Sequence, residues 1–370
     1  MKLLVRYILK ELLVPLGVWL AFLFLLLFVM QFLRTTEVLL GSAVTARDVG
    51  RLMVLLAPHF LVMAVPVAFL MAILLGLGRL GDDREIAALS ALGIGPLQIA
   101  VVPVAIGAVL GLATLGLAVS AEPYGLREVK GLVNEIIKKN IVGEVKPGIF
   151  YEDLTHLTVY AENVDKERGE WRNVLIHDDR EPTSPLLVLA REGRVNAAGR
   201  GAWLKIALDD GRVHRANRAT TDYSVIDFER AAINVGVEGR IVGKNRFRSP
   251  REEMTPGELW ESAEAAQKNH GDPKPFLVAF YSRFALALTP MSFGLLGTPL
   301  ALSGRRGGRA RGLLITILAY VGYYVLARLS ENLAIQGHLP IPVAVLAPSA
   351  AIALVGGFFL YRIARTGVRR

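Results

Sequence analysis

The sequence offers few side chains in an arrangement that performs chemistry. Its 370 residues contain no GxxxxGK[ST] phosphate loop, no HExxH or GxSxG motif, and no cysteine. No histidine is grouped with carboxylates at a metal-binding spacing, so no metal site is expected. An intramembrane enzyme would also need a nucleophile beside a base, and no such pair is evident. We therefore expect a non-enzymatic protein that binds no cofactor itself.

Two weaker patterns lie in one apolar run. Gly76, Gly78 and Gly81 form a GxGxxG pattern, but it ends the run instead of following a strand. We therefore interpret these glycines as close helix packing and a helix end, not as a dinucleotide site. His59 follows Pro58 in the same run. A membrane histidine can relay protons, but no acidic residue lies nearby in the sequence, so packing is preferred.

Four arginines near the ends of apolar runs suggest a binding role. A guanidinium can hold a phosphate through two parallel hydrogen bonds. A ring of such groups at the outer membrane face would attract an anionic lipid headgroup, and its predicted members are Arg34, Arg47, Arg283 and Arg328. The alternatives are a snorkelling role for Arg34 and, for Arg328, an ion pair with Glu331 along one helix face.

Membrane helices must carry these residues. The chain is 53% hydrophobic with a mean hydropathy of +0.43, too apolar for a soluble protein of this length. A bilayer core takes about 20 helical residues. On that basis the charge-free runs predict six spans, namely Leu12–Leu33, Leu52–Gly78, Ile86–Ala121, Phe284–Gly304, Gly312–Ala327 and Leu333–Tyr361.

The third run is too long for one span and begins inside a charged insert, RLGDDREIAALSALGIGP, at residues 79–96. Asp82 and Asp83 suit a helix N-terminus and Gly93 a helix end, which predicts a short helix within 82–93. A helix this short must dock on something. Either it is a polar loop on the membrane surface, or a groove on a partner receives its apolar side, Ile86, Leu89 and Leu92.

Basic residues predict the orientation. Most lysines and arginines that flank the spans lie on the side of both termini and of the 79–96 insert, whereas the opposite short loops hold only Arg34, Arg47 and Arg51. The positive-inside rule therefore assigns both termini to the cytoplasm. Residues 1–33 do not fit a cleaved signal peptide, because their apolar run is too long.

Residues 143–250 have a different composition, with balanced charge and apolar residues at every second position. They predict an all-β domain on the outer side, an open antiparallel sandwich or jelly roll whose edges another sheet can pair with. Asp210-Gly211 is among its predicted turns. We expect helical connectors at 122–142 and 256–268, the second capped by Thr255. The predicted domains are 1–142, 143–250 and 251–370.

Five segments in this order resemble the lipopolysaccharide export permease family: VRYILKELLVPL, GDDREIAALSALGIG, AEPYGLREVK, GIFYED and VIDFERAAINV. The first segment and the VIDFE stretch resemble the F-type permease more than the G-type. The resemblance implies a multi-pass protein of the bacterial inner membrane with six transmembrane helices and an inserted periplasmic, jelly-roll-like β domain.

The resemblance also implies partners and site residues. The partners are a paralogous permease, a cytoplasmic ATPase dimer that binds ATP, a periplasmic or bitopic β-bridge protein and lipopolysaccharide, with no nucleic acid. Arg34 matches a basic position that faces lipopolysaccharide, although Gln31 and Phe32 stand where a second basic residue is often found. The insert corresponds to the coupling helix, so its ATPase contacts would be Asp83, Arg84, Glu85, Ala88, Leu89, Leu92 and Gly93.

These inferences predict a permease subunit of an ATP-driven exporter. It would extract lipopolysaccharide from the outer leaflet of the inner membrane and pass it to the β-bridge. Closure of the nucleotide-bound ATPase would push the coupling helix and bring the spans of two permeases together. The alternative is a non-transporting membrane subunit that transmits the ATPase stroke to a periplasmic partner.

Overall fold

The computed structural model describes residues 2–39, 45–144, 147–154, 157–165, 169–181, 184–197, 203–216, 223–236, 250–302 and 308–366. These residues form two compact units. The first, which we call the helical unit, comprises Met1–Val29, Leu56–Leu126 and Pro250–Arg370; the second comprises Met30–Leu55 and Arg127–Ser249 and contains the sheet. The composition-based boundaries at 142/143 and 250/251 thus differ from this grouping, which adds Met30–Leu55 and most of the first connector to the sheet.

The six-span prediction is confirmed. Among the residues that the structure describes, six helical segments are long and apolar enough to cross a membrane. They lie on α1 (Lys2–Leu39), α2 (Ala46–Asp82), α4 (Pro96–Gly116) with its continuation, α8 (Lys274–Leu302), α9 (Gly308–Ile335) and α10 (Ile341–Thr366). A π-helical turn, η1 (Leu117–Ala121), joins α4 to α5 (Glu122–Glu144). The last span begins later than predicted, because α9 continues to Ile335.

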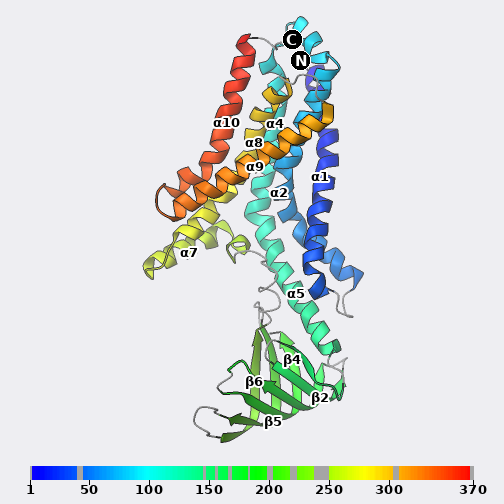
Figure 1. Cartoon of the computed structure of the whole chain (residues 1–370), viewed down its shortest axis with the longest axis vertical. Helices are drawn as coiled ribbons and strands as arrows, with labels where there is room; N and C mark the ends of the chain where they lie inside the picture. Colours follow the sequence, from blue (N-terminus) through cyan, green and yellow to red (C-terminus); the bar gives the residue numbers. More distant parts are fainter. Residues whose placement is uncertain are drawn as a thin grey trace. The chain divides into compact units, whose positions relative to one another are not determined.

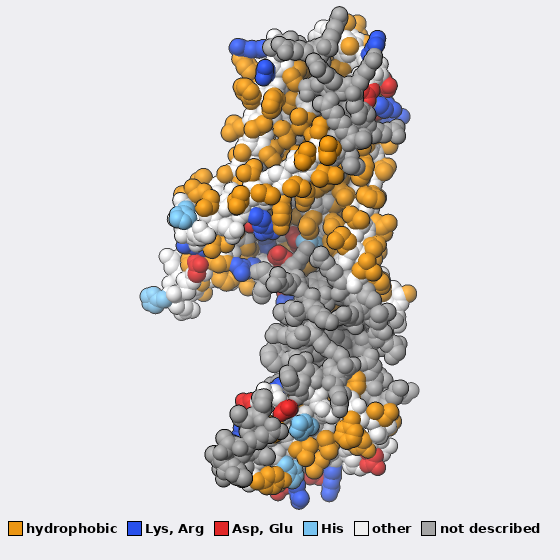
Figure 2. Space-filling model, in the orientation of Figure 1, with side chains coloured by type: hydrophobic (Ala, Val, Ile, Leu, Met, Phe, Trp, Pro, Cys, Tyr) orange, Lys and Arg blue, Asp and Glu red, His pale blue; other side chains and the backbone are white. Residues whose placement is uncertain are grey.

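The helices of the helical unit are not equally buried. Within the most apolar window of each span, 78% of α2 residues are buried, against 11% for α1 and for α9. Small residues allow the inner helices to approach closely: a side chain on Gly107 of α4 would lie 2.8 Å from the Pro290 carbonyl oxygen of α8. Helices α1 and α9 keep broad apolar faces (Figure 2).

One end of the helical unit carries many basic side chains. Figure 1 shows that α1 begins and α10 ends at the same end of the unit. Lys and Arg side chains gather there, whereas hydrophobic side chains cover the length of the helices (Figure 2). This arrangement is the one that an even number of spans predicts.

The inserted domain is an open antiparallel sheet, as predicted. Its strands are β1 (Tyr151–Leu154), β2 (Leu157–Asp165), β3 (Glu170–Asp178), β4 (Leu186–Ala197), β5 (Trp203–Ala216) and β6 (Tyr223–Gly236). Each strand pairs with the next in the chain, so the described strands form one six-stranded meander. A jelly roll would also pair strands distant in sequence, and the described residues contain no such pairing.

The predicted turn at Asp210-Gly211 is wrong, because β5 continues through it. Instead, one row of residues interrupts the backbone ladder across five strands, because no ladder pair joins neighbouring members of the row: Glu162, Asn173, Arg191, Asp210 and Glu229. Asn173 and Asp210 have left-handed backbones, with φ of 51° and 55°. We call this row the crease. The register is the same on both sides of it, because every strand is interrupted at the same level.

Two shorter elements precede α8: the 3₁₀ turn η2 (Pro250–Glu253) and α7 (Pro256–Lys268). The predicted cap of α7 is confirmed. Thr255 Oγ1 accepts from the Glu258 backbone N–H at 3.4 Å, and the Glu258 carboxylate accepts from the Thr255 N–H at 2.8 Å. This reciprocal pair satisfies two donors that the first turn of a helix leaves free.

Candidate functional site

The charged insert forms a short helix, α3 (Glu85–Ala91), but its start differs from the prediction. Helix α2 extends to Asp82, so neither Asp82 nor Asp83 caps α3. Arg84 occupies the cap position with a left-handed φ of 60° and donates no side-chain cap. The chain therefore reverses at Arg84, where a left-handed residue turns one helix end directly into the next helix.

The predicted stop of α3 at Gly93 is confirmed. Gly93 has a φ of 85°, a conformation that favours glycine. Its N–H donates to the Ser90 carbonyl at 3.0 Å, and the Ile94 N–H donates to the Leu89 carbonyl at 3.0 Å. These two bonds form a Schellman motif that closes α3 before Pro96 starts α4.

The apolar side of α3 packs mainly on its own chain. Ile86 is buried in the core of the helical unit, so the expectation that it fills a partner's groove is wrong. Leu89 is partly buried against the same core, and its contact with a partner stays a prediction. Leu92 is 79% exposed. The surface that α3 offers outward combines this leucine with small and charged residues, namely Asp83, Arg84, Ala88 and Gly93.

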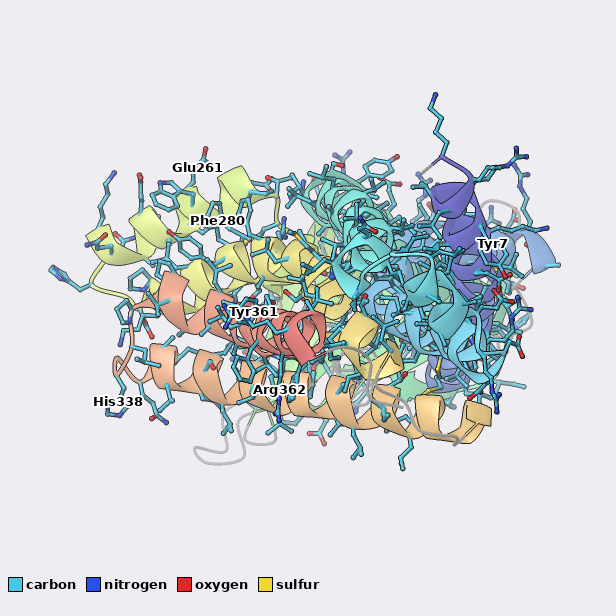
Figure 3. All side chains as sticks on the ribbon, turned by 90° about the horizontal axis from the view of Figure 1, so that it is seen from above. Tyr7, Glu261, Phe280, His338, Tyr361 and Arg362 are labelled. Carbon is cyan, nitrogen blue, oxygen red and sulfur yellow. The ribbon has the colours of Figure 1, made fainter. Side chains whose placement is uncertain are left out.

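Glu85, the remaining predicted contact residue, is held by the first helix. The Tyr7 hydroxyl donates to Glu85 Oε2 at 2.6 Å. One helical turn further along α1, Glu11 accepts from Arg79 of α2 at 2.6 Å. Figure 3 labels Tyr7 near the start of α1. Sequence reasoning missed both contacts, because the partners lie more than sixty residues apart and nothing local marks them.

The four predicted headgroup arginines fall in different units. Arg34 lies on α1, and its side chain is outside the described side chains; Arg47 is exposed in the first turn of α2. Both belong to the second unit, whereas Arg283 and Arg328 belong to the helical unit. Whether the four gather into one ring stays a prediction.

The two arginines of the helical unit differ in exposure. Arg283 is 6% exposed, and its Nη2 donates to the carbonyls of Arg251, Glu252 and Met254. It thereby organises η2 and the start of α7. The predicted pairing of Arg328 with Glu331 is confirmed at 2.8 Å, and the Arg328 guanidinium also lies 5.1 Å from the Tyr324 ring centroid. Arg328 remains largely exposed, whereas the Arg283 guanidinium is hydrogen-bonded to backbone carbonyls.

The interpretation of His59 as lacking an acidic partner is wrong. His59 Nδ1 lies 2.6 Å from Glu122 Oε1, and both side chains are largely buried. Glu122 begins α5 immediately after the π turn, and π turns in helices often occur at functional positions. The sequence could not reveal this pair, because its members come from different spans.

For Gly76, the interpretation as close packing is confirmed: an added Cβ would lie 2.6 Å from the Glu11 carbonyl oxygen.

The sheet contributes a cavity and ion pairs. A cavity of about 730 Å³ lies over the crease, lined in part by Tyr160, Asn173 and Phe228. Two ion pairs lie among its charged groups, Arg191 with Asp210 at 3.1 Å and Arg212 with Asp227 at 2.8 Å. At the end of β3, the pKa of Asp178 lies below its usual value. Burial raises this pKa, but the hydrogen bonds from Arg180 and its positive charge together lower it by more.

The described residues include no group of three or more His, Cys, Asp or Glu that could hold a metal ion. Their geometry instead provides an exposed surface helix, apolar membrane faces and an open sheet. Among known families, the model of the lipopolysaccharide export system permease LptF/LptG matches residues 6–362, nearly the whole chain. The comparison with curated proteins gives no match. The match covers the inserted sheet and all but the outermost residues of the six spans, and the chain therefore belongs to the LptF/LptG family of lipopolysaccharide export permeases.

Proposed function

We propose that this permease component of the lipopolysaccharide export system extracts lipopolysaccharide from the outer leaflet of the inner membrane and passes it to a β-bridge protein. The observation that carries this proposal is the family match over residues 6–362, which includes six spans and an inserted open sheet. The F-type assignment remains part of the proposal and rests on the segments quoted above.

Helix α3 is the proposed contact with a cytoplasmic ATPase dimer. Its outward surface combines small and charged residues with one large apolar side chain, Leu92, which is 79% exposed. A large apolar side chain in that position is suited to a pocket on a partner, because exposure to water has no benefit for it. The ATPase would bind and hydrolyse ATP, so the permease itself would need no cofactor.

The lipid path is proposed along α1 and α9. Both spans keep apolar faces that a paralogous permease or acyl chains can cover. Arg34, Arg47 and Arg328 are the proposed headgroup contacts, since a guanidinium pairs well with phosphate. Arg283 is the weakest member of the predicted set, because its guanidinium is buried against backbone carbonyls.

The sheet is the proposed acceptor of lipid. β1 and β6 are its edge strands, and β6 exposes Tyr223, Val225 and Ile226. An exposed edge can pair with a strand of another β domain, which would extend the sheet toward the bridge protein. Site-specific photo-crosslinkers along β2 and β6 test this path. Capture of neither lipid nor a β-domain partner during transport would make the sheet a spacer.

Purification in mild detergent followed by mass spectrometry tests the assembly. We expect an ATPase, a second permease and lipopolysaccharide to copurify with the chain. Reconstitution of that assembly in liposomes should then give ATP-dependent lipopolysaccharide release. Recovery of the ATPase without any lipid, and without release, would favour the non-transporting alternative.

A further inference from the structure

The first turns of α1 contact both helices that flank the reversal at Arg84. Tyr7 and Glu11 lie four residues apart and so share one helix face. Tyr7 donates to Glu85 at the start of α3, and Glu11 accepts from Arg79 near the end of α2, each at 2.6 Å. One face of α1 therefore binds the end of one helix and the beginning of the next.

A tightly packed apolar layer lies beside these polar contacts. Ile8 and Leu12 of α1 are almost completely buried, in the same cluster as Leu77, Leu80 and Ile86. The backbones also approach closely, because Gly76 leaves no room for a side chain against the Glu11 carbonyl. Packing of this density transmits displacement instead of absorbing it.

Further along, α1 is held much less. Only 11% of its apolar window is buried, and Val18, Phe22 and Leu25 are 64%, 52% and 56% exposed. The helix is thus firmly attached near its start and free on one face along its membrane length. A movement applied at the attached end would displace the free face.

We infer that Tyr7 and Glu11 are positioning residues that fasten the first span to α3, so that a displacement of α3 by the ATPase moves α1. This inference rests on the proposed function and specifies how the stroke enters the membrane. Tyr7 orients the Glu85 carboxylate, and the Glu11–Arg79 pair holds α1 against the end of α2. Neither residue was among the predicted contacts.

Transport per ATP provides the first test. Tyr7→Phe removes one hydroxyl and Glu11→Gln one charge, in the assembly reconstituted with its ATPase and partner permease. Since hydrogen bonds to charged groups are the stronger ones, we expect lipopolysaccharide released per ATP to fall about fivefold in each variant, with ATPase binding unchanged. The matched controls are Tyr361→Phe, whose ring contacts Arg365, and Lys10→Gln, which is exposed; both should behave as wild type.

A charge reversal separates positioning from general damage. Glu11→Arg alone should lose transport, and Glu11→Arg combined with Arg79→Glu should regain most of it, because the pair is restored with opposite polarity. Failure of the double reversal to improve on the single variant would argue against the pair.

Movement of α1 is the second readout. The chain has no cysteine, so spin labels at Leu25→Cys on α1 and Leu354→Cys on α10 report one distance. We expect this distance to change between nucleotide-free and ATP-trapped states, and the change to disappear in Tyr7→Phe/Glu11→Gln. An unchanged movement and unchanged release per ATP in that double variant would overturn the inference. If the unmodified assembly neither bound the ATPase nor released lipid, the proposed function would fail instead.

Discussion

At the scale of single residues, the pair His59–Glu122 buries two ionisable side chains inside the helical unit. Polar side chains at membrane depth are expensive unless they pair. The short distance of 2.6 Å means that His59 Nδ1 and Glu122 Oε1 satisfy each other. The pair joins α2 to the start of α5, within a few residues of the points at which the chain passes between the two units. Its role is therefore to fix the relative position of two helices inside the helical unit.

Removing either His59 or Glu122 should leave the other side chain buried without its partner and destabilise the protein. We expect His59→Ala or Glu122→Ala to lower the free energy of unfolding by about 3 kcal/mol, because the remaining group stays buried without its partner. Thermal unfolding in detergent measures the loss. The double variant His59→Phe/Glu122→Leu should recover much of it, and His338→Ala, an exposed histidine, is the matched control. Single variants as stable as the control would show that the pair carries no stability.

The lowered pKa of Asp178 predicts that the stability of the sheet depends on pH. Its folded pKa lies below the ordinary Asp value of about 3.9, chiefly because Arg180 outweighs the effect of burial. A lowered folded pKa stabilises the fold above the unfolded pKa, and this contribution is lost as the pH falls through the folded pKa. We therefore expect stability to decline below about pH 4.

The fluorescence of Trp171, a fully buried residue of β3, reports this loss once Trp19, Trp203 and Trp260 are replaced by Phe. Asp178→Asn should unfold with a flatter pH profile in this range. A profile identical to that of the parent would show that Asp178 does not supply the acid sensitivity.

At the scale of elements, the sequence predicts structure where the cause is local. Thr255 with Glu258, and Gly93 with Pro96, are local signals, and both helix boundaries follow from them. The crease could not be predicted, because an aspartate followed by glycine has the same local preference in a turn and in an interrupted strand. Neighbouring strands decide the outcome: Gly211 continues the ladder opposite Ala190 and Phe228. Contacts such as Tyr7–Glu85 depend on tertiary packing in the same way.

Close packing at Gly211, next to the crease, predicts the effect of adding a side chain there. A Cβ there would lie 2.6 Å from the Phe228 ring and closer still to the Leu189 carbonyl. We expect Gly211→Ala to destabilise the sheet by about 2 kcal/mol, since the backbone contacts cannot move without breaking the ladder. Lys205→Ala on the same strand is the exposed control. Hydrogen exchange of the β4 and β5 amides gives the measurement, and equal protection in both variants would contradict the close packing.

Substitution of Leu92 and of Leu89 should have different effects, the first on ATPase binding and the second on stability. Leu92→Asp changes an exposed side chain, so it should reduce copurification of the ATPase at least fivefold without changing thermal stability. Leu89→Asp places a charge against the core and should lower stability instead. Full ATPase recovery with Leu92→Asp would show that Leu92 and the surface of α3 around it do not contact the ATPase.

At the scale of the whole molecule, the two units are built from contacts of different range. The sheet pairs each strand with the next, so its contacts are local in sequence. The helical unit combines three separated stretches, and Thr316 of α9 contacts Met71 of α2 across 245 residues. Composition predicted the six spans and the inserted sheet, because long apolar runs and period-two alternation are strong signals, but it did not predict the grouping of Met30–Leu55 with the sheet. It could not predict which helices would be central, since α1 and α2 are equally apolar but differ greatly in burial.

The orientation of the whole molecule gives the last prediction. The basic residues near the start of α1, near the end of α10 and around α3 favour the cytoplasm, so we expect the sheet on the opposite side. Because the chain has no cysteine, Leu92→Cys on α3 and Ile226→Cys on β6 each introduce a single exposed thiol, 79% and 57% exposed as the native residues. A membrane-impermeant maleimide added to spheroplasts should label Ile226→Cys fully and Leu92→Cys only after permeabilisation. The cysteine-free parent controls for background. Labelling of Leu92→Cys in intact spheroplasts would reverse the topology and separate α3 from any cytoplasmic ATPase.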